Sequence, residues 1–157
     1  MNKMLITALL TLFTTTAIAD KNPNHWLRNA EDDSKRFQLL ESQIGGFSGA
    51  MVEVGQRYES IYEALERDNT ELALYHWEKI RSAIENGYQR RPGRQANADA
   101  MFLDTVWQPT RDAIADGKRK NYKKHFNRAR EACMACHVAE EVPFMNDQSM
   151  FELKFKQ

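Results

Sequence analysis

Two cysteines and a histidine near the end of the sequence have the types and the spacing that tether a haem. Cys133 and Cys136 are the only two cysteines, and His137 follows them directly, which spells C-x-x-C-H. Each thiol can add across one vinyl group of a porphyrin, and the adjacent imidazole then lies within reach of the iron. On a helix, this spacing places both sulfurs on one face. The pattern predicts one covalent haem c with His137 as the proximal iron ligand.

Three other chemistries use closely spaced cysteines. A zinc site needs four ligands, and no second Cys/His pair stands at a finger-like spacing in the sequence. A thioredoxin-type dithiol lies in a strand–helix context, whereas the residues around Cys133 have the pattern of a continuous helix. A disulfide across two intervening residues of a helix would be strained and would close almost no loop. Haem attachment is favoured over all three.

The first residues have the pattern of a secretory signal peptide. Lys3 supplies the positive charge, residues 5–13 the apolar region, and Ala17-Ile18-Ala19 the cleavage site. Residues 1–19 are therefore expected to be removed, so that the mature chain begins at Asp20. The apolar run is shorter than the roughly 20 residues that span a membrane, and no membrane insertion is expected. Thioether formation on haem is associated with the far side of the bacterial inner membrane, so we expect a periplasmic protein.

Length and charge bound the class of protein further. Removing 19 of the 157 residues leaves 138, enough for one domain with a hydrophobic core. Lys+Arg and Asp+Glu number 22 each, so the formal net charge is zero and the loss of Lys3 lowers it by one. Nucleic acid is not an expected partner, because there is no basic excess to neutralise phosphates.

Helical periodicity dominates the sequence after the signal, and strand patterns are nearly absent. Residues 20–45 are expected to form a partly helical arm that ends at a glycine pair. Residues 46–144 are expected to form the main domain, and 145–157 a short tail. Apolar stripes predict four helices, at about 47–65, 70–89, 97–115 and 121–140. Asp68-Asn69-Thr70 offers an N-cap to the second helix, and Asp116-Gly117 closes the third. The positions expected to face the core are Phe47, Met51, Val54, Tyr58, Ile61, Leu65, Ala73, Trp77, Ile80, Ile84, Gly87, Phe102, Val106, Pro109, Ala113, Tyr122, Phe126, Ala129, Cys133 and Cys136.

Four amphipathic helices with short connectors favour an all-α fold, an antiparallel four-helix bundle that holds a cofactor between facing helices. With C-x-x-C-H on the last helix, the chain resembles the class II cytochromes c, that is, the cytochrome c′ family and its low-spin relatives. The resemblance rests on residues 46–51, 68–75 and 133–144. It implies one haem on the C-terminal helix and, as in the low-spin relatives, a ligating methionine at Met51. Residues 138–141 depart from the family, which tends to carry an aromatic and a basic residue after the haem histidine.

The sixth ligand of the iron decides what the haem does. A thioether from Met51 would favour the reduced iron and raise the potential relative to a second histidine. Met51 also lies on an apolar stripe, where methionine commonly fills the core. An iron left five-coordinate is a further alternative. Weaker candidate ligands are His25, His76, His125, Met101, Met145 and Met150. Aromatic residues expected either to wall the porphyrin or to fill the core are Phe47, Tyr58, Trp77, Phe102, Phe126 and Phe144.

Two functions follow from these alternatives. A haem with two protein ligands carries electrons between transient redox partners, and no enzymatic activity is expected of it. A five-coordinate haem would instead bind nitric oxide or carbon monoxide. A peroxidase would need a distal acid–base residue beside a positive group, and the sequence offers no such constellation.

Homodimerisation is left open. A basic cluster is either a solvated surface or a docking patch for an acidic redox partner: Lys118, Arg119, Lys120, Lys123 and Lys124.

Overall fold

The computed structural model describes residues 22 and 24–156, so the predicted signal peptide and its cleavage site lie outside the described residues. Within that range the regular structure is entirely helical, as the sequence predicted, and about four helical stretches are long. The chain divides into two compact units, with the boundary between Glu41 and Ser42. None of the described helices has the length and apolar composition needed to cross a membrane.

The first unit contains most of α1 (Asp33–Ile44). Asp32 starts this helix, because its carboxylate accepts a hydrogen bond from the backbone N–H of Lys35 at 2.7 Å. No residue of α1 is buried, and the ring of Phe37 is 62% exposed. The stretch predicted as a partly helical arm therefore contains one helix, α1, that buries none of its residues.

In the second unit, α2 (Phe47–Glu66) and α3 (Thr70–Arg90) form an antiparallel pair. The predicted cap at residues 68–70 is confirmed, and Asn69 is the capping residue: its side chain accepts a hydrogen bond from the backbone N–H of Leu72 at 3.1 Å. The start of α2 lies against the end of α3. A Cβ atom on Gly87 would stand 2.8 Å from the ring of Phe47, so only glycine allows this close approach.

The third helical stretch differs in register from the prediction. A short 3₁₀ turn, η1 (Pro92–Arg94), leads into α4 (Gln95–Ala98), a π-helical segment η2 (Asp99–Trp107) and α5 (Gln108–Ala115). The wide π turns bury neighbouring positions in pairs, Leu103 with Phe102 and Trp107 with Val106. The prediction that Pro109 faces the core is wrong, because Pro109 is exposed. Proline cannot donate a backbone hydrogen bond, and the widened turns before it rotate the following residues, so that Thr110 faces inward instead.

The last long helix is α6 (Arg119–Ala139), which follows Gly117 in the left-handed conformation at φ 70°. It ends in a Schellman turn, in which Val142 N–H donates to the carbonyl of His137 and Glu141 N–H to that of Val138. Glu141 occupies the left-handed position at φ 60°. The turn reverses the chain just beyond the haem motif.

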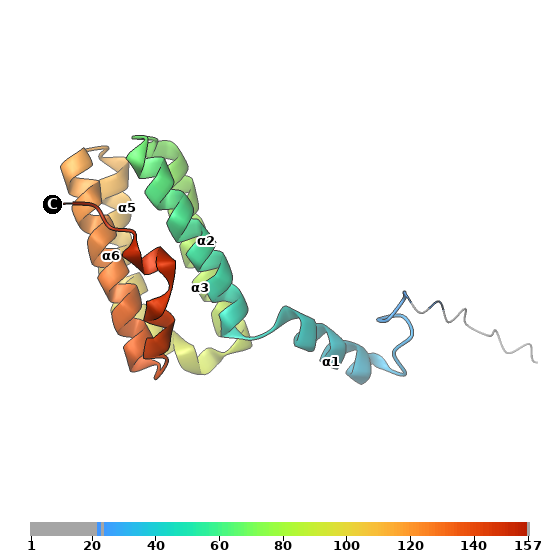
Figure 1. The fold of residues 1–157 in the computed structure, drawn as a ribbon. Helices are drawn as coiled ribbons and strands as arrows, with labels where there is room; N and C mark the ends of the chain where they lie inside the picture. Colours follow the sequence, from blue (N-terminus) through green and yellow to red (C-terminus); the bar gives the residue numbers. More distant parts are fainter. Residues whose placement is uncertain (1–21, 23, 157) are drawn as a thin grey trace, which may run out of the picture. The chain divides into compact units, whose positions relative to one another are not determined.

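Residues 143–156, here called the C-terminal strap, contain the 3₁₀ turns η3 (Pro143–Asp147) and η4 (Ser149–Glu152). The strap runs back along α6 in Figure 1, where it is drawn in red. Its η3 turn contacts α6 and its η4 turn contacts α2. Phe151 and Phe155 are both 4% exposed, so a segment that the sequence predicted only as a short tail completes the core.

The core lies among four helical stretches, with α2 packed on α3, α3 on α5, and both η2 and α5 on α6. Large rings link α2 to α6: the rings of Tyr58 and Phe126 stack with centroids 4.5 Å apart. Of the aromatic residues expected to line a porphyrin or fill the core, Phe144 does neither in this structure, since it is 69% exposed. The others are buried or partly buried against the core: Phe47, Tyr58, Trp77, Phe102 and Phe126.

Candidate functional site

The C-x-x-C-H residues lie in the last turns of α6, where helical structure continues through the motif. Cys133 and Cys136 are both free thiols of intermediate exposure, and Cys133 packs against the hydrophobic core. Their spacing of three residues on a helix puts both sulfurs on the same side of α6. The helical context agrees with the sequence argument against a strand–helix dithiol motif.

The two thiols are held in their neutral form. Burial raises the pKa of Cys133 to about 12, and the neighbouring Cys136 adds to the rise. Burial also raises the pKa of Cys136, against the opposing charge of Arg94. Reactive dithiols and thiolate metal ligands depend on a lowered pKa, which this pair does not have. Within residues 22 and 24–156, no group of three or more His, Cys, Asp or Glu side chains converges as a metal site would require.

The imidazole of His137 has a defined partner. Its Nδ1 lies 2.8 Å from the side-chain oxygen of Asn146 in η3, and the side-chain nitrogen of Asn146 donates to the Met134 carbonyl at 3.1 Å. The ring of Phe151 stands edge-on to the imidazole, with centroids 5.5 Å apart. With Nδ1 engaged, Nε2 is the ring nitrogen left to bind a metal.

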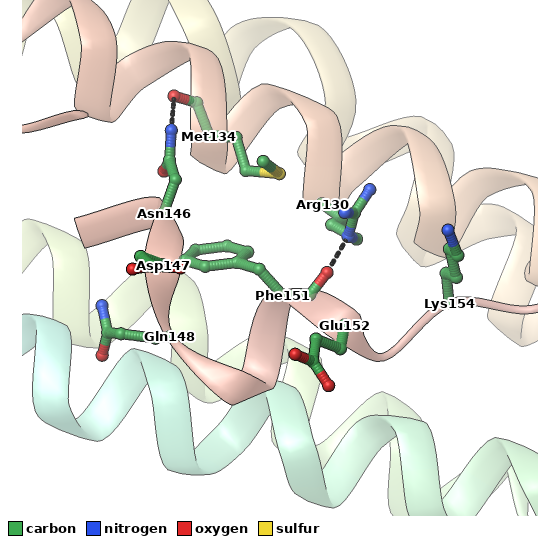
Figure 2. Close-up of a pocket in the computed structure, with 8 residues that line it drawn as sticks. All are labelled: Arg130, Met134, Asn146, Asp147, Gln148, Phe151, Glu152 and Lys154. Carbon is green, nitrogen blue, oxygen red and sulfur yellow. Dashed lines mark hydrogen bonds between the residues drawn. The ribbon is translucent and has the colours of Figure 1, made fainter. Parts of the chain in front are cut away.

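A cleft of about 300 Å³ lies between α6 and the C-terminal strap, beside the motif. Figure 2 shows Asn146 bonded to the Met134 carbonyl at one end of the cleft and Arg130 bonded to the Phe151 carbonyl further along. Both signs of charge line the cleft. Its lining residues are Arg130, Met134, Asn146, Asp147, Gln148, Phe151, Glu152 and Lys154.

Two methionines lie near the same stretch of α2. Met51 is partly buried against the core, as its place on the apolar stripe predicted. Met150 of the strap is also packed there, and a Cβ on Gly55 would stand 3.2 Å from its sulfur. Sequence reasoning gave Met150 little weight, because it required the tail to fold back. Gly55 was the available signal, since glycine inside a helix usually has a packing reason.

The other candidate ligands are engaged elsewhere or lie in other elements. Nδ1 of His76 is 3.2 Å from Nη1 of Arg57, which places this histidine at the flank between α2 and α3. Burial and the charge of Arg57 lower the pKa of His76. His125 lies on α6 twelve residues before His137, about 18 Å along the axis. Three further candidates lie in the first unit, η2 and η3 respectively: His25, Met101 and Met145.

Carboxylates offset part of the basic cluster at the start of α6. Arg119 pairs with Asp68 at 2.7 Å, Lys118 with Asp116 at 2.8 Å, and Lys123 with Glu66 at 3.5 Å. These pairs favour a solvated, internally balanced surface over a strongly positive docking patch.

Comparison with protein-family models, with curated proteins and with solved structures finds no match for this chain. Its function therefore has to be argued from the site itself.

Proposed function

We propose that the chain is an exported monohaem c-type cytochrome of the class II type, which carries electrons between redox partners in the periplasm. The observation that carries this proposal is the arrangement at the end of α6. Two neutral thiols one turn apart precede a histidine whose Nδ1 is engaged by Asn146. Attachment to porphyrin vinyl groups, with iron bound by Nε2, uses all three groups at once.

The side chains at the end of α6 have the chemistry that a covalent haem requires. The tether would be Cys133 and Cys136, and His137 would be the proximal ligand. The haem would be attached to α6 and lie inside an antiparallel four-helix bundle. The α2–α3 pair and the packing of α5 on α6 support that architecture. When bound, the haem supplies a one-electron couple whose potential the protein sets through ligands, hydrogen bonds and burial.

Met51 is proposed as the sixth ligand. It is partly buried on the inner side of α2, and a thioether at this position would favour the reduced iron. Transient redox proteins are the proposed partners. Two exposed apolar side chains close to the motif, Val138 at 59% and Phe144 at 69%, suit a small contact of short lifetime.

The first test is the mass of the exported protein after denaturation in acid and organic solvent. We expect the polypeptide to retain one haem, and Cys133→Ser with Cys136→Ser to release it completely. Ala135→Ser is the matched control, because it adds a hydroxyl at an exposed position between the two thiols and should keep the haem. A colourless wild-type polypeptide of bare mass would refute the proposal.

The second test is the optical spectrum of the oxidised and reduced protein. Two protein ligands predict six-coordinate, low-spin iron, and Met51→Ala should convert it to high-spin iron. Met150→Ala is the paired variant on the strap. A low-spin spectrum lost only in Met150→Ala would move the sixth ligand to the strap. Rapid carbon monoxide binding by the reduced wild type would favour the five-coordinate alternative, a haem that binds nitric oxide or carbon monoxide.

A further inference from the structure

We propose that Asn146 is the positioning residue of His137: its side-chain oxygen accepts the Nδ1 proton, so that Nε2 is the nitrogen presented to the iron. The role toward iron rests on the proposed function, whereas the hydrogen bond between Asn146 and His137 does not.

The orientation of the Asn146 amide decides the tautomer of His137. The Met134 carbonyl can only accept a hydrogen bond, so the atom of Asn146 that lies 3.1 Å from it must be the NH₂ nitrogen. The side-chain oxygen then faces Nδ1 of His137 at 2.8 Å. An amide oxygen only accepts, so Nδ1 must carry the proton and Nε2 the lone pair. A flipped amide would set two acceptors against each other at Met134.

Asn146 is itself held by the turn that follows α6. The Schellman turn ties Val142 N–H to the carbonyl of His137, and Met145 N–H then donates to the carbonyl of Val142. These bonds tie the eight residues between His137 and Asn146 into one hydrogen-bonded turn. The α6 carbonyl that binds the Asn146 amide belongs to Met134, inside the C-x-x-C-H motif. The same short segment therefore orients both the backbone and the imidazole of the motif.

A hydrogen-bond acceptor on Nδ1–H makes the imidazole a stronger electron donor through Nε2. A stronger donor stabilises the oxidised iron, so the acceptor lowers the reduction potential. Replacing the amide with a carboxylate should lower the potential further, and removing the acceptor should raise it. A residue that served only to pack the strap would not give shifts of opposite sign.

The hydrogen bond is tested first, by NMR of the purified full chain labelled with ¹⁵N at histidine, reduced if it carries haem. We expect a His137 Nδ1–H signal whose exchange with water is slowed by the hydrogen bond. In Asn146→Leu, which keeps the shape and removes the acceptor, exchange should become about fivefold faster, the ratio that one ordinary hydrogen bond supports. Asn127→Leu is the matched control, because Asn127 holds the far end of the strap through the backbone of Phe155.

A proton found on Nε2 of a haem-free wild type, or exchange that is equal in Asn146→Leu and wild type, would overturn the proposal. Exchange accelerated equally by Asn127→Leu would also overturn it, since a loosened strap would then explain the change. This measurement does not need a haem, so it stands even if the mass of the protein refutes the proposed function.

The second measurement is the midpoint potential of the haem-bearing protein. We expect the order Asn146→Asp lowest, wild type intermediate and Asn146→Leu highest. Shifts of the same sign in the two variants, or none, would show that Asn146 packs the strap without positioning the imidazole.

Discussion

The α2–α3 pair and the α6–strap side of the molecule bury their residues in different ways. In the pair, two long helices pack directly: Trp77 is fully buried, and Gly87 lets the helices approach closely. On the other side, the buried residues of α6 end at Ala129. Beyond that point the cysteines and His137 are half-buried, and the strap contacts His137 through Asn146 and Phe151.

The strap is attached by its buried rings, Phe151 and Phe155, and by hydrogen bonds to its backbone. Asn127 accepts from the N–H of Phe155 at 2.9 Å and donates to its carbonyl at 2.8 Å, and the Tyr58 hydroxyl donates to the Leu153 carbonyl at 3.1 Å. Each such bond contributes about 1 kcal/mol net, which is less than a large buried side chain in a helix pair contributes. The comparison teaches that the helix pair buries the larger share of the core, and that the candidate chemistry lies where a short segment closes it.

The largest expected effect comes from removing a buried side chain of the α2–α3 pair. Trp77→Ala should lower the free energy of unfolding by about 3–5 kcal/mol, because it empties a fully buried site. It also removes the indole N–H that donates to the Trp107 carbonyl at 3.0 Å. Urea unfolding measures the change. Trp26→Ala, at a position 45% exposed, is the control and should change the stability by less than about 1 kcal/mol. Equal losses in the two variants would contradict the comparison.

Phe151→Ala tests the strap side and should lower the free energy of unfolding by about 2–3 kcal/mol, near the lower end for a buried phenylalanine. The loss should be smaller than at Trp77, because a short segment can settle into the space that the ring leaves. Phe144→Ala removes an exposed ring from the same strap and should have an effect within about 0.5 kcal/mol of zero. If the loss of unfolding free energy at Phe151 is as large as that at Trp77, the strap relaxes no further into the empty space than the helix pair does.

Tyr122 links the two sides, because it shares its single hydroxyl proton between the carboxylate of Asp68 and the carbonyl of Leu65. Tyr122→Phe should lower stability at neutral pH by about 1–2 kcal/mol through the lost hydrogen bonds. Burial and the hydrogen bond to Asp68 raise the pKa of Tyr122 from 10.0 to about 12.

Above pH 10.0 the unfolded chain loses this phenol proton while the folded protein still holds it. The contribution of Tyr122 to stability is therefore complete below pH 10.0 and declines as the pH rises toward about 12. Urea unfolding over this range should show the gap between wild type and Tyr122→Phe closing. Burial also raises the pKa values of Tyr58 and Tyr88, and both proteins share those contributions. A gap that widens with pH would contradict the assignment, and Tyr75→Phe on the exposed side of α3 is the control.

The smallest effect is expected at the ends of α2 and α6. Both ends place an acidic residue in the left-handed conformation, Asp68 at φ 54° and Glu141 at φ 60°. Glu141→Gly should raise the free energy of unfolding by about 1 kcal/mol, because glycine adopts this conformation without a steric penalty. Asp68→Gly should lower it, since the carboxylate bonds with Arg119 and Tyr122 are lost. Thermal unfolding measures both, and changes of the same sign would show that backbone strain does not decide the outcome.

Local signals predicted most of the helices. The Asn69 cap and the left-handed Gly117 lie where the sequence placed them, because both depend on neighbouring residues alone. The rotation of η2 before Pro109 was missed, since a stripe read with the α-helical period cannot reveal a π-helical segment. The strap was missed because its contacts are distant in sequence, such as the 95 residues between Tyr58 and Leu153.

At the candidate site, the contiguous motif identified the two thiols and the imidazole without any knowledge of the fold. Asn146 was not identified, because an asparagine after a proline reads as an ordinary turn residue. Its role depends on the reversal at Glu141, a left-handed position without glycine that sequence patterns do not signal. The chain beyond that reversal packs Met150 against Gly55, so a second thioether lies beside α2.

The placement of Phe151 and Phe155 has a consequence for how damage to the gene would act. A premature stop codon just before Ser149 would leave α1 through α6 and the whole C-x-x-C-H motif intact. It would still delete two rings that are each 4% exposed, and it would leave the core residues beneath them open to water. Such a truncation would behave as a core mutation, although an inspection of helices and motifs would judge the product complete.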